Sequence, residues 1–329
     1  MATYIVRRLF LAFFTLIVIT MFVYALIRNM PGSPLSIDMA ESDPRRQMTA
    51  EDRKLAEQAY GLDKPWHIAY GHWVLDLARL DLGTSFRYRQ PVGHLILQNL
   101  GPTLLLSIPS FLATLAAAIP IGMFVTRNSG KPSERLLSVI LYMLYSLPSF
   151  VCGLWLLYLF YLRLADTMFQ LPPGMKSDGY DSYSPLGKMG DLLRHLILPF
   201  VAYSYSALAS ETRFIKANME ETIRQDYIRT ARAKGLDDRT ILYKHAFRNT
   251  LIPFVTMLGL SLPGLITGAI ILERIFNWPG IGSLYLFALT FQDYPLIMGL
   301  TLMFSVVTVL SQLLADIIYA FVDPRVTHS

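Results

Sequence analysis

The stretch "QPVGHLILQNLGPTLLLSIPSFLATLAAAIPIGMFVT", residues 90–126, contains no Asp, Glu, Lys or Arg. A run of about 18 to 20 apolar residues is long enough to cross the hydrocarbon core of a membrane as a helix. The wider composition agrees, because 53% of the chain is hydrophobic and only 16% is charged, whereas soluble domains carry about 25% charged residues. The chain is therefore predicted to be an integral membrane protein.

Six stretches without these charged residues occur along the chain, and together they predict its topology. They cover residues 9–27, 90–126, 136–162, 195–210, 249–272 and 294–315. The fourth is the shortest, but it can extend past Glu211 because a charge near a helix end can reach the membrane surface. A cleaved signal peptide is disfavoured because the first run is long and lacks a small-residue cleavage site. We therefore predict an all-α membrane fold with six spans.

Basic residues in the short connections predict the orientation of these spans, since such residues gather on the cytoplasmic side of a membrane. Arg7 and Arg8 precede the first span, and more basic residues lie at 127–135 and 213–248. The connection at 163–194, by contrast, carries as many acidic as basic residues. Both termini are therefore expected on the cytoplasmic side of the membrane. The net charge of +5 follows from this asymmetry and indicates no nucleic-acid partner.

The connection at residues 28–89 is the only one large enough for a subdomain outside the membrane. Thr49 as an N-cap and Gly61 as a stop predict a short polar helix there, and Pro65 is expected at the first position of a second helix. Apolar residues recur at helical spacing in that second helix: Trp66, Ala69, Tyr70, Trp73, Leu77 and Leu80. This stripe fits either a membrane interface or packing against the first helix of the connection.

Prolines and hydroxyls inside the predicted spans favour kinked helices around a polar path. The prolines are Pro102, Pro109, Pro120, Pro148, Pro199, Pro253 and Pro263. Proline frees backbone carbonyls, and at membrane depth neighbouring helices, hydroxyls or water must satisfy them. The candidates to line a path for a polar solute are Tyr203, Ser206 and Ser210 of the fourth span and Thr256 of the fifth. Interhelical packing by the same hydroxyls is the alternative.

Residues for independent energy coupling or catalysis are not evident in the sequence. It contains no G-x-x-x-x-G-K-[ST] loop for ATP, no H-E-x-x-H metal spacing and no G-x-S-x-G nucleophile. Glu211, Glu273 and Asp316 fall near predicted span ends, where water or headgroups are expected to reach them, so proton coupling is disfavoured. Cys152 is expected to be a small packing residue. We expect no enzymatic activity, and no metal or cofactor in this chain.

One connection is both basic and rich in helix signals. It reads "QDYIRTARAKGLDDRTILYKHAFRNTLIP" over residues 225–253. Ile228 and Ala231 share one face of a first helix, and Gly235 can end that helix in the left-handed conformation. A short helix with a defined end is therefore expected in this connection.

A second helix follows in the same connection. Asp237 or Asp238 can cap it, and it is expected to run from Arg239 to about Arg248, with basic residues near its C-terminal end. Small residues such as Ala233 leave room for another protein surface to approach. We predict a rigid knob for docking, and the alternative is a solvated connector.

At these residues the sequence resembles the permease subunits of binding-protein-dependent ABC importers, in the dipeptide, oligopeptide and nickel branch. That family carries a cytoplasmic loop of the form E-A-A, three residues, then G. With Gly235 on that glycine, Ala231 falls on the second alanine and Thr230 on the first, and Arg229 stands where the glutamate would be. The loop thus follows the branch's own version, "YIRTARAKGL…HAxRNxLIP", and no role of the glutamate carries over.

Further motifs in matching order extend the resemblance over nearly the whole chain. They are "RRL" at Arg7, "MPGSP" at Met30, "YGLDKP" at Tyr60, "LDLGTSFRYRQPV" at Leu80, "HLILP" at His195, "ERIFNWPGIG" at Glu273, "DYP" at Asp293 and "DPR" at Asp323. The resemblance implies the type I ABC importer permease fold. The expected parts are an N-terminal transmembrane helix at 1–30, an extracytoplasmic loop subdomain at 31–93, a permease core at 94–322 with its coupling loop at 216–248, and a cytoplasmic tail at 323–329.

The same resemblance implies the partners and the coupling residues. The expected assembly in the lipid of the inner (plasma) membrane contains this chain and a second permease subunit, which in this branch is usually a different chain. It also contains two ATPase subunits that hold ATP and Mg²⁺, and an extracytoplasmic solute-binding protein. Movement of the ATPases would reach the path through the loop at 226–248. The residues expected to carry this coupling are Arg229, Thr230, Ala231, Ala233, Gly235, Asp238, His245 and Arg248.

At the predicted outer face, "ERIFNWPGIG" is interpreted as a tight turn. Trp278, Pro279, Gly280 and Gly282 would form part of a gate or of the dock for the binding protein, and packing is the alternative. The implied function is import of di- or oligopeptides, although members of this branch also carry nickel and other solutes. Two other function classes stay open: a membrane scaffold or enzyme without a transport role, and a self-contained secondary carrier.

Overall fold

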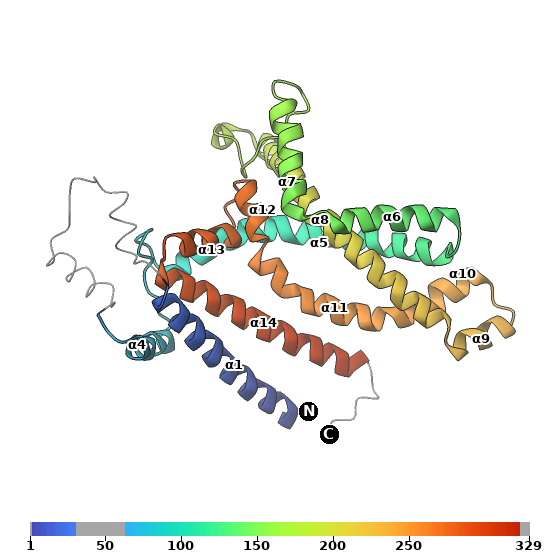
Figure 1. Ribbon diagram of the computed structural model, residues 1–329, viewed down its shortest axis with the longest axis horizontal. Coiled ribbons are helices and arrows are strands. Elements are labelled where there is room, and N and C mark those ends of the chain that lie inside the picture. The colour runs from blue at the N-terminus through green and yellow to red at the C-terminus, as the bar shows by residue number, and fades with distance from the viewer. Residues whose placement is uncertain (1, 31–62, 323–329) are drawn as a thin grey trace. The chain divides into compact units, whose positions relative to one another are not determined.

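The computed structural model describes residues 2–30 and 63–322, without the side chains of residues 2–6, 9, 252, 255, 256 and 316–322. The helix expected between Thr49 and Gly61 lies outside these residues. Within them the chain is built from helices joined by short connections, as the composition predicts (Figure 1).

The helices follow one another in the order that Figure 1 labels. They are α1 (Ala2–Arg28), α4 (Trp66–Ala78), α5 (Val92–Arg127), α6 (Pro132–Ser146), α7 (Ser149–Leu157), α8 (Pro185–Ile223), α9 (Asp226–Ala233), α10 (Asp238–Thr240), α11 (Phe247–Thr267), α12 (Ile270–Ile275), α13 (Ile281–Thr290) and α14 (Tyr294–Val322). A π-helical turn over Tyr158–Arg163 continues α7, another over Ile241–Ala246 joins α10 to α11, and Tyr180–Ser182 form a 3-10 turn.

Most of the predicted spans coincide with long apolar helices. By length and composition, the segments that could each cross a membrane are Phe10–Arg28, Val92–Arg127, Pro185–Ile223, Met257–Ile275 and Tyr294–Ala315. The run that is shortest in the sequence lies inside α8, which has 39 residues. α8 continues to Ile223, well past Glu211, as expected from the tolerance of charges near helix ends.

The third predicted span, at 136–162, is broken. α6 and the segment formed by α7 and its π-helical turn meet at 88°, next to Pro148. Proline disfavours the helical conformation in the residue before it, and Leu147 is extended, with a ψ of 119°. The Leu147 carbonyl accepts a hydrogen bond of 2.6 Å from the Tyr205 hydroxyl of α8. The prolines that lie inside continuous helices are Pro102, Pro109, Pro120, Pro199, Pro253 and Pro263.

The helices pack into two compact units. Among the residues that the structure describes, the first comprises 2–30, 63–100 and 284–309, and the second comprises 101–283 and 310–322. These units do not follow the four-part division expected from the resemblance. That division describes the sequence in relation to the membrane, and it stays a prediction.

In the first unit, α4 packs on α1, and α5 packs on α14. Tyr70 of α4 meets Tyr24 of α1 edge-on, with ring centroids 5.6 Å apart. The apolar stripe of α4 therefore contacts the first span directly. Pro65 was expected at the first position of this helix but is its N-cap, so α4 begins one residue later than expected, at Trp66. Gly299 of α14 leaves room for Val92 of α5, since a Cβ there would lie 2.5 Å from Val92 Cγ1.

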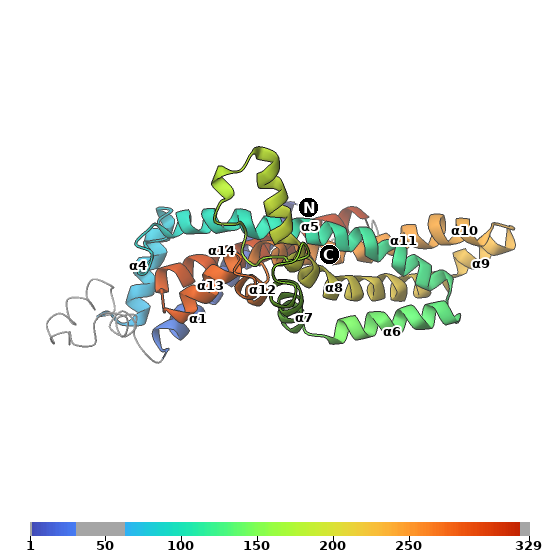
Figure 2. The same cartoon turned by 90° about the horizontal axis from the view of Figure 1, so that it is seen from above.

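The core of the second unit joins the long helices to the loop that follows α8. Its buried members are Ala118, Met123, Ile215, Met219, Ile228, Ala231, Ile241, Leu242, Ala246 and Phe254. Gly122 of α5 allows close approach, because a Cβ there would lie 2.7 Å from Ile215 Cγ2 of α8. α6 also contacts α8, beside which it runs in Figure 2. The loop after α8 is therefore part of the folded unit.

Candidate functional site

The helix that follows α8 is anchored on one side and exposed on the other. Ile228 of α9 is fully buried and Ala231 is nearly so, in the same core as α8. Gly235 then takes a φ of +78°. Its N–H donates to the Arg232 carbonyl at 2.9 Å, and the Leu236 N–H donates to the Ala231 carbonyl at 3.3 Å. This helix end confirms the left-handed conformation predicted for Gly235.

Asp237 caps the next helix, as the sequence predicts. Its carboxylate accepts a hydrogen bond from the Thr240 N–H at 3.1 Å, and hydrogen bonding with Thr240 holds the pKa of Asp237 below its usual value. The prediction that this helix ends near Arg248 is wrong. α10 passes through the π-helical turn at Ile241–Ala246 into α11 without a break, because buried residues hold that turn in the core and no proline occurs before Pro253.

The loop presents a continuous exposed surface. Residues 232–239 are all exposed, and a Cβ at Gly235 would meet no atom of the described residues within 4 Å. Of the predicted coupling residues, the exposed ones are Arg229, Thr230, Ala233, Gly235, Asp238 and Arg248. His245 is half-buried and Ala231 is buried. Ala231 therefore packs inward and supports the loop, and it adds no contact area of its own.

A second candidate region is the turn at residues 268–283, between α11 and α13. Trp278 is fully buried in it. The indole N–H of Trp278 donates to the Pro102 carbonyl at 2.8 Å, and its backbone N–H donates to the Glu273 carbonyl at 2.7 Å. Of the residues predicted at this turn, Pro279 is exposed, and the buried ones are Trp278, Gly280 and Gly282. Packing therefore accounts for the tryptophan.

Glu273 in this turn is completely buried, which contradicts the expectation that water or headgroups reach it. Its Oε1 accepts a hydrogen bond from the Thr103 hydroxyl at 2.9 Å, and its Oε2 accepts one from the Ser283 N–H at 2.9 Å. Thr103 Oγ1 in turn accepts a hydrogen bond from the Ile281 N–H at 2.7 Å. A carboxylate tolerates burial only with such partners. The expectation failed because these partners come from α5 and α13, which the local sequence does not reveal.

Glycines leave room for this carboxylate. A Cβ at Gly280 would lie 2.5 Å from the Glu273 carboxyl carbon, and one at Gly282 would lie 2.6 Å from the Ile270 Cα. Gly268 combines a φ of 70° with a ψ of −177°, a conformation nearly restricted to glycine. A Cβ there would also meet the Glu273 carboxylate. The "ERIFNWPGIG" motif and Gly268 thus enclose one buried acid.

A second buried carboxylate, Asp293, organises the first unit in a similar way. It accepts hydrogen bonds from the Leu296 N–H of α14 at 3.3 Å and from the Ser85 hydroxyl at 2.5 Å. The N–H groups of Phe86 and Arg87 also donate to it, at 3.2 and 3.1 Å. The motifs "LDLGTSFRYRQPV" and "DYP" therefore meet at one side chain. Sequence reasoning missed this contact because its two ends lie 208 residues apart.

The hydroxyls predicted to line a polar path have different surroundings. Tyr203 is half-buried, and its hydroxyl donates to the Gly264 carbonyl of α11 at 3.3 Å, which fits the packing alternative. Ser206 is half-buried as well. Ser210 is exposed and lines a cavity between α6 and α8. The side chain of Thr256 lies outside the described residues.

Ser177, Asp191 and His195 meet near the start of α8, at the "HLILP" motif. The Ser177 hydroxyl donates to Asp191 Oδ1 at 2.5 Å and lies 3.1 Å from His195 Nε2. His195 Nδ1 lies 3.1 Å from the carbonyls of Pro173 and Gly174, which can only accept. A nucleophilic serine needs a carboxylate on Nδ1 and its own proton directed to Nε2. Here the carboxylate binds the serine instead, so the cluster ties the preceding segment to α8.

Metal ligands do not gather in the part of the chain that the structure describes. Within residues 2–30 and 63–322, no group of three or more His, Cys, Asp and Glu is placed to hold a metal ion. Cys152 is half-buried in α7. Its neighbour Gly153 is buried, and a Cβ there would lie 3.2 Å from Leu272 and Phe276, so this part of α7 packs closely on α12.

Comparisons with known proteins place these features in context. Residues 118–328 match the family model described as "Binding-protein-dependent transport system inner membrane component", and residues 1–107 match the corresponding N-terminal model. The chain is 34% identical over 329 residues, all of both chains, to the oligopeptide transport system permease protein AppB of Bacillus subtilis. It is 34% identical over 341 residues, 100% of this chain and 99% of the other, to the di/tripeptide transport system permease protein DppB of Pseudomonas aeruginosa.

A third relative and one solved structure complete the comparison. The glutathione transport system permease protein GsiC of Salmonella typhimurium is 30% identical over 328 residues, which cover all of both chains. A chain of the MetNI methionine ABC transporter, in an inward-facing conformation, superposes with a TM-score of 0.50 at 16% identity and covers 70% of this chain and 96% of its own. That likeness concerns the fold, and it confirms the expected type I importer permease fold.

Proposed function

Because the chain belongs to the family of inner membrane components of binding-protein-dependent transport systems, we propose that it forms the membrane path of an ATP-driven importer for short peptides. The observation that carries the proposal is the alignment of oligopeptide, di/tripeptide and glutathione permeases with the whole of this chain at 30 to 34% identity. Family members are transport components, so the chain is a permease subunit and not an enzyme. A second permease subunit, identical or different, would complete the path.

Energy for transport has to come from partner subunits, since the chain carries no phosphate-binding loop. The ATPase contact is assigned to the loop at 226–248. Its support is the exposed run at 232–239 and the open space at Gly235. The buried side of the loop packs in one core with α8 and α11. A displacement of the loop would therefore be passed to the spans.

The proposed orientation puts this loop and both termini in the cytoplasm and the turn at 268–283 outside. Pro279, which is exposed in that turn, is then a candidate contact for the binding protein. In a Cys152→Ser background, Asp181→Cys should react with an impermeant thiol reagent in intact cells, and Lys234→Cys should not. Both positions are exposed in this chain, and labelling of Lys234→Cys by a membrane-permeant thiol reagent would show that the membrane, and not a covering partner, blocks the impermeant one. The reverse pattern would contradict the orientation and the coupling role together.

Transport itself can be tested by reconstitution. In proteoliposomes that contain the chain with its partner permease and ATPases, a labelled tripeptide should enter only when ATP and the binding protein are present. The purified chain alone should hydrolyse no ATP and move no peptide. Peptide uptake by the chain alone, driven by an ion gradient, would instead assign it to the secondary carriers.

A further inference from the structure

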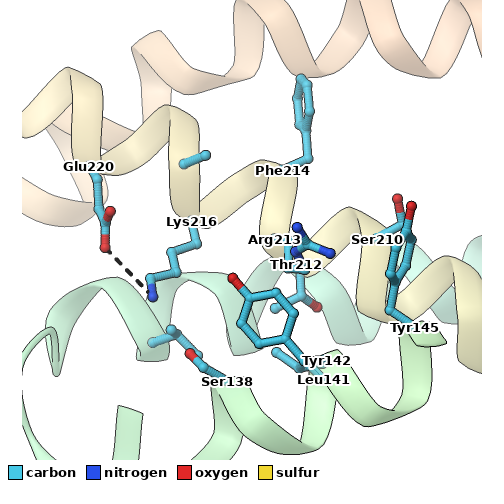
Figure 3. Close-up of a pocket in the computed structure, with 12 residues that line it drawn as sticks. Ser138, Leu141, Tyr142, Tyr145, Ser210, Thr212, Arg213, Phe214, Lys216 and Glu220 are labelled. Carbon is cyan, nitrogen blue, oxygen red and sulfur yellow. Dashed lines mark ion pairs between the residues drawn. The ribbon is translucent and has the colours of Figure 1, made fainter. Parts of the chain in front are cut away.

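A cavity of about 480 Å³ lies between α6 and α8. Figure 3 shows Tyr142 and Tyr145 on its α6 wall and Ser210, Arg213 and Lys216 on its α8 wall. We infer that this cavity binds the phosphate of a membrane phospholipid, whose acyl chain lies along α6. The inference does not depend on which solute the transporter carries.

The guanidinium of Arg213 is the group that would bind the phosphate. It lies over the rings of Tyr142 and Tyr145, at 4.6 and 4.9 Å from their centroids. Among the described residues it makes no ion pair and no hydrogen bond. The rings stabilise its faces by cation–π attraction, and its N–H donors stay free. Free guanidinium donors at the end of a membrane span suit phosphate oxygens, which pair with arginine in bidentate fashion.

The other charges of the cavity are already compensated. Lys216 Nζ lies 2.6 Å from Glu134 Oε1 and 3.8 Å from Glu220 Oε1, and Figure 3 marks the second of these ion pairs. Arg213 lies one turn further from the end of α8, about 4.5 Å along the helix axis, beyond the reach of that pairing. The hydroxyl of Ser210, on the same wall, also has no hydrogen-bond partner among the described residues. A phosphate at Arg213 would therefore meet a second donor.

An apolar groove continues from this cavity along α6. Val139, Tyr142, Met143, Ser146 and Leu147 line the groove, and Tyr142 lines the cavity as well. Its side chains face outward, since Met143 is 68% exposed and Val139 is 49% exposed. The cationic cavity matches the phosphate of a phospholipid, and the exposed apolar groove matches its acyl chain. The carboxylate of a soluble peptide would match the cavity but not the groove.

The test uses the complete transporter with its partner subunits, so that a face covered by another subunit would show no binding. Native mass spectrometry would count the molecules retained after addition of phosphatidylglycerol, of diacylglycerol with the same chains, or of glycerol phosphate. We expect phosphatidylglycerol to be retained. The other two probes carry only the chains or only the phosphate, and their retention should be at least about fivefold weaker.

Variants of Arg213 locate the site. Arg213→Gln removes the charge and should lower retention of phosphatidylglycerol about fivefold, whereas Arg213→Lys should keep part of it. The matched control is Lys188→Gln, because Lys188 of α8 lies over the Tyr180 ring at 5.6 Å but is no part of the cavity wall or of the loop assigned to the ATPase contact. Elution of each variant as an intact complex reports that it folds.

Several results would overturn the inference. Equal retention of the three probes, no retention by the assembled transporter, or unchanged retention by Arg213→Gln would each do so. Displacement of the lipid by glycerol phosphate alone would assign the cavity to a free phosphate compound. Displacement by a transported tripeptide would assign it to the solute path, and the lipid site would then be rejected.

Discussion

The turn at 268–283 and the loop at 225–248 each contain a glycine with a positive φ, but the space around the two glycines differs. At Gly268, with a φ of +70°, a Cβ would collide with Glu273 and lie 3.1 Å from Thr103 Cγ2. At Gly235, with a φ of +78°, a Cβ would meet no described atom within 4 Å. In the turn, Gly268 is needed both for its backbone conformation and because no side chain would fit there. In the loop, this chain by itself needs Gly235 only for its backbone conformation.

This difference separates two kinds of damage. A substitution in the turn acts on the chain's own packing and should lower the amount of folded protein in the membrane. A substitution in the loop leaves that packing intact, so its main effect should appear in the association with a partner. The following changes test this separation, ordered by the loss of folding stability that we expect.

The largest loss is expected from Gly282→Val in the turn. A Cβ at this position would lie 2.6 Å from the Ile270 Cα and 2.9 Å from the Ile270 N, and backbone atoms cannot move aside as the end of a flexible side chain can. We expect a destabilisation of about 3 kcal/mol or more and a severe fall in folded protein. Quantification of monodisperse protein extracted from membranes measures this fall.

The matched control for that change is Gly264→Ala in α11. A Cβ at Gly264 would meet nothing within 4 Å in the described part of the chain, and alanine favours a helix over glycine by about 1 kcal/mol. The Gly264→Ala protein should therefore be as abundant as the unchanged protein. Equal abundance of the Gly282→Val and Gly264→Ala proteins would contradict the packing account of the turn.

A smaller loss is expected from Thr103→Val, which removes one hydroxyl from the Glu273 cluster. The Glu273 carboxylate would lose a donor and the Ile281 N–H would lose its acceptor, while the shape of the side chain stays nearly the same. Leaving buried polar groups unsatisfied should cost about 2 to 3 kcal/mol. The apparent melting temperature of the purified protein should fall for Thr103→Val and much less for Thr103→Ser. Identical values for the two variants would show that the hydroxyl does not support the turn.

In the loop, Gly235→Val should change association more than stability. The left-handed conformation destabilises a residue that has a side chain by about 1 to 2 kcal/mol. This loss is small enough that the abundance of the Gly235→Val protein in the membrane should stay near normal. Co-purification of the ATPase subunits and peptide uptake should be lost, because the valine enters the space assigned to the partner.

Gly235→Asn separates conformation from space at the same position. Asparagine visits the left-handed region more readily than other side chains, but it still fills the open space. We therefore expect Gly235→Asn to weaken ATPase association as well. Full association in both variants would make the loop a solvated connector, and the comparison between loop and turn would fail.

The smallest effect is expected at the Asp237 cap. Its pKa lies below the usual value because of hydrogen bonding with Thr240, so the cap stabilises the helix start above the usual carboxyl pKa of about 3.9 and is lost as the pH falls through the lowered value. Asparagine caps without titrating. Hydrogen exchange at residues 238–241, corrected for intrinsic rates, should show acid loss of protection in the unchanged protein and none in Asp237→Asn. The same acid dependence in both would exclude Asp237 as the cause.

Features that depend on near neighbours in the chain are predicted well from the sequence. The left-handed Gly235 and the Asp237 cap involve groups within a few residues, so their signals lie in one short stretch. The long spans follow from apolar runs in the same way. The break at Pro148 was only half predicted: a proline was expected to kink a span, but the local sequence does not indicate a bend of 88°. At this bend Tyr205 of another helix donates a hydrogen bond to the Leu147 carbonyl.

Features that distant residues build together were not predicted. Glu273 was expected near water because it follows the end of the apolar run at 249–272. That position gives no information about Thr103, which lies 170 residues away in the sequence. The helix expected to end near Arg248 continues because Ile241, Leu242 and Ala246 are held in a core shared with α8. Tertiary packing decided both cases. The cavity beside Arg213 belongs to the same class, since its walls come from two helices.

From Asp238 to Thr267 the chain forms one uninterrupted helical rod. At about 1.5 Å per residue it is about 45 Å long, which matches the full thickness of a bilayer with its headgroups. Because the helix continues through its π-helical turn and past Pro253 and Pro263, we expect a movement at one end to displace the other end as well. The exposed loop lies at one end, and the other end stops at Gly268, beside the buried Glu273. A displacement of the loop is therefore expected to reach Gly268, where the helix ends, and this glycine is the candidate hinge between the helix and the turn.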